Sequence, residues 1–145
     1  MMIKLTRDVI DYFILTETVR HGSCGAVVTF LGTVRDLTGD KVTVALDYEA
    51  YPGMAEKKMR EIEADARGRW PIGELAIEHR LGRLEVGDIS VAVAVSTPHR
   101  GDAFEACRYV MDRFKELVPI WKKENWADGS TEWVHPGAES APPPA

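Results

Sequence analysis

Cysteine is scarce in this chain, and so is histidine. The 145 residues include two cysteines, Cys24 and Cys107, which lie far apart in sequence and form no CxxC pair, and four histidines without metal-ligand spacing. These absences exclude a disulfide framework and a zinc-binding motif as organising features. We expect both thiols to be reduced and structural, and we expect no metal site.

Long apolar runs and an excess of basic charge are also missing. No segment approaches the roughly 20 apolar residues of a membrane span, and the N-terminal residues lack the apolar core of a signal peptide. The net charge of −5 argues against a nucleic-acid binder, which usually has a basic excess or a basic face. We therefore expect a soluble cytoplasmic protein with no membrane or nucleic-acid partner, in which any cationic cluster is local.

What the chain does contain is the composition of an ordinary globular domain, with 45% hydrophobic and 28% charged residues. A length of 145 residues is close to the commonest size for one domain. We expect a single domain over residues 1–135. Residues 136–145 are rich in proline and alanine, have almost nothing to bury, and are expected to form a disordered tail.

Hydrophobic periodicity predicts alternating helices and pairs of strands. Helices are expected over Asp8–Arg20, with Thr6 as N-cap, Met54–Arg67 and Gly101–Val118, and strands over Gly25–Arg35, Lys41–Ala50, Leu75–Leu81, Asp88–Ser96, Ile120–Trp126 and Thr131–Val134. The order αββαββαββ favours an α+β fold with a mixed or antiparallel sheet.

Three local patterns sharpen this prediction. In the strand 88–96, large residues alternate with small ones, which predicts a central strand with a helix packed closely on its small face. The strands 25–35 and 41–50 flank a turn and are expected to form a hairpin, whereas 82–87 is expected to be a short connection. Gly32, inside a strand, indicates a bulge or a close approach to the backbone.

Lys115 is the most informative single residue. On a helical wheel it lies beside Phe104 and Met111, at the edge of the apolar stripe of its helix. Two interpretations stay open. The ammonium either reaches water or pairs with Asp112, or it is partly desolvated, with a lowered pKa that suits a nucleophile or an acid/base group.

Lys122 and Lys123 follow a break at Pro119, which cannot continue the helix and biases Val118 away from helical dihedrals. Neighbours in an extended segment point to opposite faces, so at most one of the two lysines can share a site with Lys115. Taken alone, the pair is typical of a solvated charge run.

His99 and Arg100 lie where the strongest strand leads into a helix. Backbone NH groups and the positive end of a helix dipole make such a junction suitable for an anion, and arginine is a bidentate donor to phosphate. Equally, Asp102 or its neighbours cap the helix and Arg100 is merely solvated. Arg35, at the end of another strand beside Asp36, gains interest only if it converges with the other cations.

Taken together, the motifs resemble one family in a fixed order. GAVVTFLGTVRD, YEAYPGMAEKKMREI, RWPIG, HRLGRLEVGD, STPHRGDAFEA and FKELVPIWKKE resemble the large catalytic subunit of molybdopterin synthase, over roughly residues 6–134. The resemblance implies an α/β hammerhead fold of the α+β class, with a mixed, largely antiparallel sheet and three main helices.

The resemblance also implies a function. Members of that family form a central homodimer within a heterotetramer, and each binds a small ubiquitin-like sulfur-carrier subunit whose C-terminal glycine is a thiocarboxylate. Two sulfurs pass to cyclic pyranopterin monophosphate and give the dithiolene of molybdopterin, in molybdenum cofactor biosynthesis. No metal or organic cofactor is needed for this sulfurtransferase step.

Site residues follow from the same resemblance. The family's essential lysines match Lys115 and Lys122, which are expected to be catalytic. Substrate-binding positions match Thr33, Val34, Arg35, His99, Arg100, Lys115, Lys122, Lys123 and Glu124, and the apolar residues near the pocket match Phe30 and Met111. Two other classes of function remain open: a non-catalytic phosphate- or nucleotide-binding module, and an assembly protein whose lysines dock an acidic partner tail.

Overall fold

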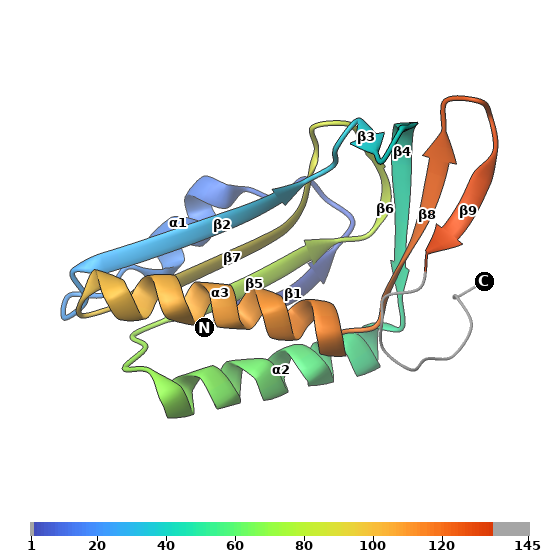
Figure 1. The fold of residues 1–145 in the computed structure, drawn as a ribbon. Coiled ribbons are helices and arrows are strands. Elements are labelled where there is room, and N and C mark those ends of the chain that lie inside the picture. Colours follow the sequence, from blue (N-terminus) through green and yellow to red (C-terminus); the bar gives the residue numbers. More distant parts are fainter. Residues whose placement is uncertain (1, 135–145) are drawn as a thin grey trace.

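The computed structural model describes residues 2–134, which form two sheets and three helices (Figure 1). Along the chain the elements are β1 (Met2–Thr6), α1 (Tyr12–Val19), β2 (Ala26–Thr33), β3 (Leu37–Thr38), β4 (Lys41–Ala50), α2 (Pro52–Arg69), β5 (Leu75–Arg80), β6 (Gly82–Glu85), β7 (Ile89–Thr97), α3 (Arg100–Leu117), β8 (Ile120–Trp126) and β9 (Thr131–Val134). The predicted tail at 136–145 lies outside the described residues.

One sheet has four strands, in the order β1-β5-β7-β2. Only the β1–β5 pair is parallel, and the other two pairs are antiparallel. Helices α2 and α3 lie side by side on one face of this sheet and α1 lies on the other (Figure 1). The predicted α+β class, with three helices and mixed, largely antiparallel pairing, is therefore confirmed.

Strand β7 is an inner strand of the four-stranded sheet, as predicted, and its two faces pack against different helices. Val91, Val93 and Val95 belong to the main core beneath α2 and α3, whereas the small Ala92 and Ala94 pack against α1. The alternation of large and small residues therefore decides which face a short helix can approach closely.

Helix α1 is shorter than predicted and exposes a different face. Asp11, and not Thr6, is its N-cap: the Ile14 backbone NH donates to Asp11 Oδ1 at 3.0 Å. Leu15 and Val19 are its buried residues, one turn apart, whereas Phe13 is 69% exposed. Two apolar stripes compete in this short segment. Helical spacing predicts a buried stripe of Val9, Ile10, Phe13 and Ile14, of which only Ile10, before the helix begins, is buried.

Three strands were missed and one hairpin was wrong. The two-residue strand β3 lies in the predicted turn between residues 35 and 41 and pairs with β4. β1 pairs in parallel with β5, a long-range pairing that local patterns do not encode. β6 occupies the expected connection 82–87 and pairs with β4. β2 pairs with β7 and not with β4, so the two predicted partners of the hairpin belong to different sheets.

The second sheet has the order β3-β4-β8-β9, with β6 also paired to β4. Along β4 the pairing with β8 shifts in register between Thr43 and Ala45, so the side chains before the shift are reversed. Alternation in the sequence predicts Val42 on the same face as Leu46 and Tyr48, but Val42 is 48% exposed and Thr43 is buried instead.

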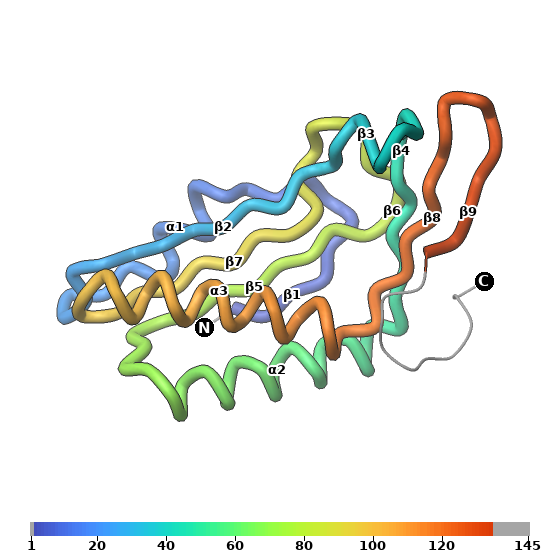
Figure 2. Tube along the Cα trace, in the orientation of Figure 1, coloured from blue at the N-terminus to red at the C-terminus, as the bar shows by residue number. Residues whose placement is uncertain are grey.

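Helix α3 is connected at its C-terminal end to strand β8 of this second sheet. Helix α3 ends at Leu117, as Pro119 predicts, and the chain turns directly into β8 (Figure 2). The predicted bounds of β8 and β9 are confirmed. Residues near the last turn of α3 and residues on β8 are thereby brought to the junction of the two sheets.

Candidate functional site

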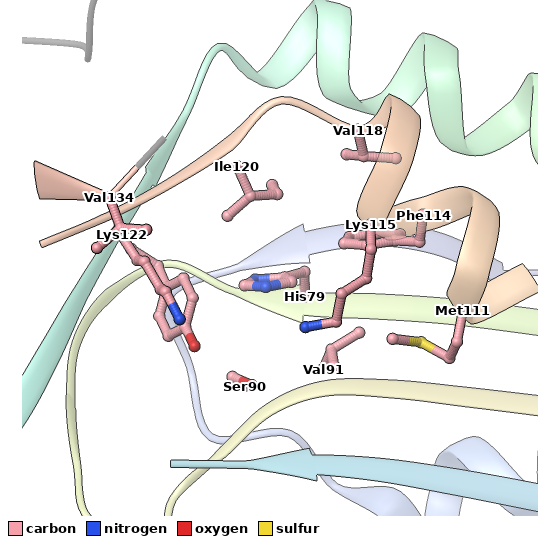
Figure 3. Close-up of a pocket in the computed structure, with 11 residues that line it drawn as sticks. His79, Ser90, Val91, Met111, Phe114, Lys115, Val118, Ile120, Lys122 and Val134 are labelled. Atoms are coloured by element: carbon pink, nitrogen blue, oxygen red, sulfur yellow. The ribbon is translucent and has the colours of Figure 1, made fainter. Parts of the chain in front are cut away.

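A cavity of about 270 Å³ lies at this junction, between the C-terminal turns of α3 and the strands β4, β5, β7 and β8 (Figure 3). Its lining residues are Tyr48, His79, Ser90, Val91, Met111, Phe114, Lys115, Val118, Ile120, Lys122 and Val134. The apolar residues come mainly from α3 and the start of β8, and the two lysine side chains reach the same space from α3 and from β8 (Figure 3).

An adjoining cavity of about 180 Å³ shares part of this lining, including both lysines. It adds Thr33, Val34 and Arg35 from the end of β2 and the residues after it, and Glu124 from β8. Arg35 therefore converges with Lys115 and Lys122 although the three are far apart in sequence. Three cationic side chains in two connected cavities suit an anionic ligand.

Lys115 is an exposed residue in the last turn of α3 and lines both cavities. Asp112, one of the partners that the sequence left open for it, pairs instead with Arg108, at 3.7 Å. Within residues 2–134 Lys115 makes no ion pair. Its stem packs along the cavity wall and its ammonium remains available to a ligand.

Lys122 is the lysine whose charge is desolvated. It is half-buried, and burial lowers its pKa below 10.5; the nearby charges of Lys115 and Arg35 act in the same direction, and Glu124 opposes them. A lysine with a lowered pKa suits proton exchange with a bound ligand.

Glu124 is the only carboxylate among the lining residues of the two cavities within the described chain. It is 2% exposed and accepts a hydrogen bond of 3.0 Å from the Thr43 hydroxyl. Its negative charge lies near Lys122 and favours the ammonium form of that lysine. Glu124 thus offsets part of the repulsion among the three cations.

Lys123 points away from both cavities, as its place next to Lys122 in a strand requires. Its ammonium lies 3.8 Å from Asp47 Oδ2 and 5.9 Å from the centre of the Trp133 ring. The Lys123 ammonium therefore has a carboxylate and an aromatic partner within the chain and needs no ligand to balance its charge.

His99 and Arg100 are not brought to the lysines within one chain. They stand at the N-terminus of α3, where His99 is the N-cap without a side-chain capping bond. With a rise of about 1.5 Å per residue, Arg100 is about 22 Å along the helix from Lys115. The predicted junction of strand and helix exists, but it lies at the other end of α3.

The remaining predicted positions lie near the cavities. Met111 lines both, and Phe30 lines the smaller one. Gly32 explains why β2 can pass so close: a Cβ there would be 2.7 Å from Val91 Cγ1, and the pairing with β7 shifts in register between Gly32 and Thr33. Both the bulge and the close approach expected at this glycine are present.

Sequence reasoning missed three polar residues of the larger cavity: Tyr48, His79 and Ser90. Each belongs to a strand whose alternation was recognised, but alternation cannot show which strands meet. Burial raises the pKa of Tyr48, and the neighbouring Ser90 hydroxyl acts in the opposite direction, so the Tyr48 hydroxyl keeps its proton at neutral pH.

Neither cysteine contributes to this site. Cys107 is buried in α3 and burial raises the pKa of its thiol to about 11. Cys24 lies close to Gly73 and is partly exposed. Among residues 2–134 no cluster of three His, Cys, Asp or Glu side chains could hold a metal ion, and no helix there is long and apolar enough to cross a membrane.

These features define a class: an α+β protein of two sheets whose junction holds connected cavities lined by lysine and arginine. Comparison with known proteins gives the family. The family model described as "MoaE protein" matches residues 5–117, and the chain belongs to this family.

Named relatives agree with this assignment. The chain is 56% identical over 118 residues to the molybdopterin synthase catalytic subunit of Halalkalibacterium halodurans, a match that covers 81% of this chain and 75% of the relative. The crystal structure of molybdopterin synthase from Staphylococcus aureus is 43% identical, with a TM-score of 0.85 over 90% of this chain and 94% of that one. The hammerhead fold expected from the resemblance is therefore confirmed.

A more distant structure supports the fold alone. It is a complex of subunits 1 and 2 of molybdopterin-converting factor from Helicobacter pylori, 21% identical, with a TM-score of 0.73 over 92% of this chain and 88% of that chain.

Proposed function

We propose that this chain is the catalytic subunit of a molybdopterin synthase, which transfers sulfur from a thiocarboxylated small carrier subunit to cyclic pyranopterin monophosphate and forms the molybdopterin dithiolene. The observation that carries the proposal is the convergence of Arg35, Lys115 and Lys122 on connected cavities at the sheet junction. A phosphate and a thiocarboxylate are both anions, and both need cationic partners in a confined site.

The state of the cysteines supports a sulfur that arrives on a partner. Sulfur transfer through a persulfide needs an accessible thiol that ionises readily. Cys107 is buried with a raised thiol pKa, and Cys24 does not line the lysine cavities. The sulfur source is then the carrier's C-terminal thiocarboxylate, and the chain itself needs no cofactor for the step.

The lysines place positive charge next to the atoms on which the reaction develops negative charge. The thiocarboxylate sulfur forms a bond to a carbon of the pterin precursor as an oxygen substituent leaves that carbon with its bonding electrons and takes up a proton. Water then attacks the acyl carbon of the carrier. When the acyl carbon–sulfur bond breaks, the sulfur stays on the pterin and the carrier leaves with a carboxylate. Lys115 is our first choice to stabilise the acyl oxyanion and to exchange protons with the substrate, and Lys122 is the second.

The assembly that we propose is a homodimer of this chain within a heterotetramer that includes two carriers. One edge of β2 has no partner strand among residues 2–134, and beside it Phe30 and Phe104 are 40% and 62% exposed. An unpaired edge next to exposed aromatic residues favours association. A second copy would also give His99 and Arg100 a way to reach a cavity that their own chain keeps far from them. We place the reaction in the cytoplasm.

Reconstitution tests the proposal directly. Purified protein is combined with thiocarboxylated carrier and the pterin precursor, and the dithiolene product is assayed. The wild-type chain should form product, and Lys115→Ala should lose nearly all turnover with its fold intact. A binding module or an assembly protein would show no turnover in the wild type, and Lys115→Ala would then change only an affinity.

Mixing variants tests whether two copies share a site. Arg100→Ala should weaken substrate binding more than carrier binding; equal weakening of both would count against a phosphate role. If Arg100 serves the cavity of the other copy, mixing Arg100→Ala chains with Lys122→Met chains should regain turnover, because each mixed dimer has one site with both residues intact. Mixtures without regained turnover would place Arg100 outside the cavity of a second copy.

A further inference from the structure

His79 is held rigidly in the wall of the larger cavity. It is 4% exposed and lies between two aromatic rings: Phe114 stacks on it with centroids 5.7 Å apart and an interplanar angle of 1°, and Tyr48 meets it edge-on at 4.9 Å. Its Nδ1 lies 2.9 Å from the Arg80 carbonyl oxygen. Three contacts therefore fix both the position and the rotation of the ring.

These contacts also fix the proton on the ring. A carbonyl oxygen only accepts, so Nδ1 carries the hydrogen of that bond. Burial, opposed by this bond and assisted by the charge of Lys115, lowers the pKa of His79 to about 4, which leaves the ring neutral at physiological pH. In a neutral ring protonated at Nδ1, Nε2 is an acceptor.

Nε2 opens onto the cavity. It makes no hydrogen bond within residues 2–134, and yet it is not among the fully enclosed polar atoms that lack a partner there. His79 lines the cavity with Lys115, and Figure 3 shows both side chains at the same opening. The other polar side chains of this cavity belong to Tyr48, Ser90, Lys115 and Lys122, all of which carry donor hydrogens.

We propose that His79 is a positioning residue for Lys115: when the exposed Lys115 side chain turns toward the ring, the Nε2 lone pair accepts a hydrogen bond from the ammonium and orients that group toward the reacting atoms. A carboxylate in this place would neutralise the charge that the oxyanion needs, whereas a neutral imidazole fixes direction and leaves the charge free. The inference rests on the proposed function of the same cavity, and it adds a role for a residue that no motif had assigned.

Three substitutions test separately the aromatic ring of His79, its donor at the δ position and its acceptor at the ε position. His79→Phe keeps an aromatic ring between Tyr48 and Phe114 but has no acceptor. His79→Asn keeps a donor near the Arg80 carbonyl, at the δ position, and has no acceptor at the ε position. His79→Gln places an acceptor at the ε position. Thermal melts of the variants show which fraction is folded in each assay.

Turnover with thiocarboxylated carrier and pterin precursor should fall about 10- to 100-fold in His79→Phe and His79→Asn, because a misdirected catalytic group costs that much. KM should change little, and His79→Gln should recover most of kcat. Equal kcat in folded His79→Phe and wild type would overturn the proposal, as would a loss in His79→Gln as large as that in His79→Phe.

If the wild type forms no product, the proposed function is rejected. The contact between His79 and Lys115 can still be tested by spectroscopy. In nitrogen-15 NMR of the full chain at neutral pH, His79 should show a protonated Nδ1 and an unprotonated Nε2. Lys115→Met should shift the Nε2 resonance, and Lys57→Met, on the exposed face of α2, should not. A proton on Nε2, or an Nε2 resonance insensitive to Lys115, would refute the contact.

Discussion

Tyr48 and Lys122 are direct partners across the antiparallel pair of β4 and β8. Tyr48 also packs edge-on against His79 of β5. One wall of the lysine cavity therefore runs continuously from the five-stranded sheet to the four-stranded sheet. The position of Lys122 consequently depends on the register of β4 with β8, and not only on the turn at Pro119.

Substitution of the two adjacent lysines of β8 should have very different effects on turnover. Lys122→Met keeps most of the apolar stem but removes a charge that lines both cavities, and we expect turnover to fall about 100-fold or more. Lys123→Met removes a charge that lies beside Asp47, and its loss should be far smaller. Steady-state kinetics of both variants check the expectation, and equal losses would show that the strand face does not decide the role.

The neutral state of His79 should make stability depend on pH. Its pKa falls from 6.5 to about 4 in the folded chain, so between these values the unfolded state binds a proton that the native state does not. Stability should therefore be lost as the pH falls from 6.5 to 4, by about 3 kcal/mol in total. Urea titrations of wild type and His79→Phe across this range measure it. The wild type should lose this stability as the pH falls and the variant should not, so the difference in unfolding free energy between them should change by about 3 kcal/mol. Parallel curves would contradict a depressed pKa.

Local patterns in the sequence were sufficient to predict where most helices and strands lie, but not which strands pair with one another. Helix α3 and strands β7, β8 and β9 have strong periodicity and clear breakers, and their predicted bounds agree with the structure within a few residues. Helix α1 was assigned the wrong face because eight residues leave room for two apolar stripes. Strand β1 and the β4–β6 pair depend on long-range pairing, which no local pattern encodes.

Some residues of the site could be predicted from the sequence and others could not. Arg35, Lys115 and Lys122 were named from motifs, and the structure brings them to connected cavities. His79 and Tyr48 were not found, because their importance arises only where β4 and β5 meet α3. The distance of Arg100 from Lys115 follows from the helix rise alone and could have been read from the sequence.

Gly32 should tolerate no side chain. A Cβ at this position would lie 2.7 Å from Val91 Cγ1, a stiff branched side chain in the cavity wall. Gly32→Ala should cost about 1–3 kcal/mol of unfolding free energy and weaken substrate binding as Val91 shifts. Denaturant titration and binding measurements check this. Gly22→Ala, where nothing lies within 4 Å, is the matched control and should change stability by less than about 0.5 kcal/mol.

Both cysteines should be dispensable for turnover. Cys107 is 5% exposed with a thiol pKa raised to about 11, so iodoacetamide at neutral pH should label Cys24 well before it. The double variant Cys24→Ser, Cys107→Ala should keep activity with thiocarboxylated carrier. Lost turnover in a well-folded double variant would point to a persulfide on this chain.

Strand β9 gives the last described residues a place in the site, because Val134 lines the larger cavity and pairs with Lys122. A premature stop codon between Trp126 and Thr131 would leave every strand of the four-stranded sheet and all three described helices encoded. The product would nevertheless lack one side of the lysine cavity and leave β8 with an open edge. Such an allele should behave genetically as a loss of enzyme function, even though most of the folded mass of the protein is still made.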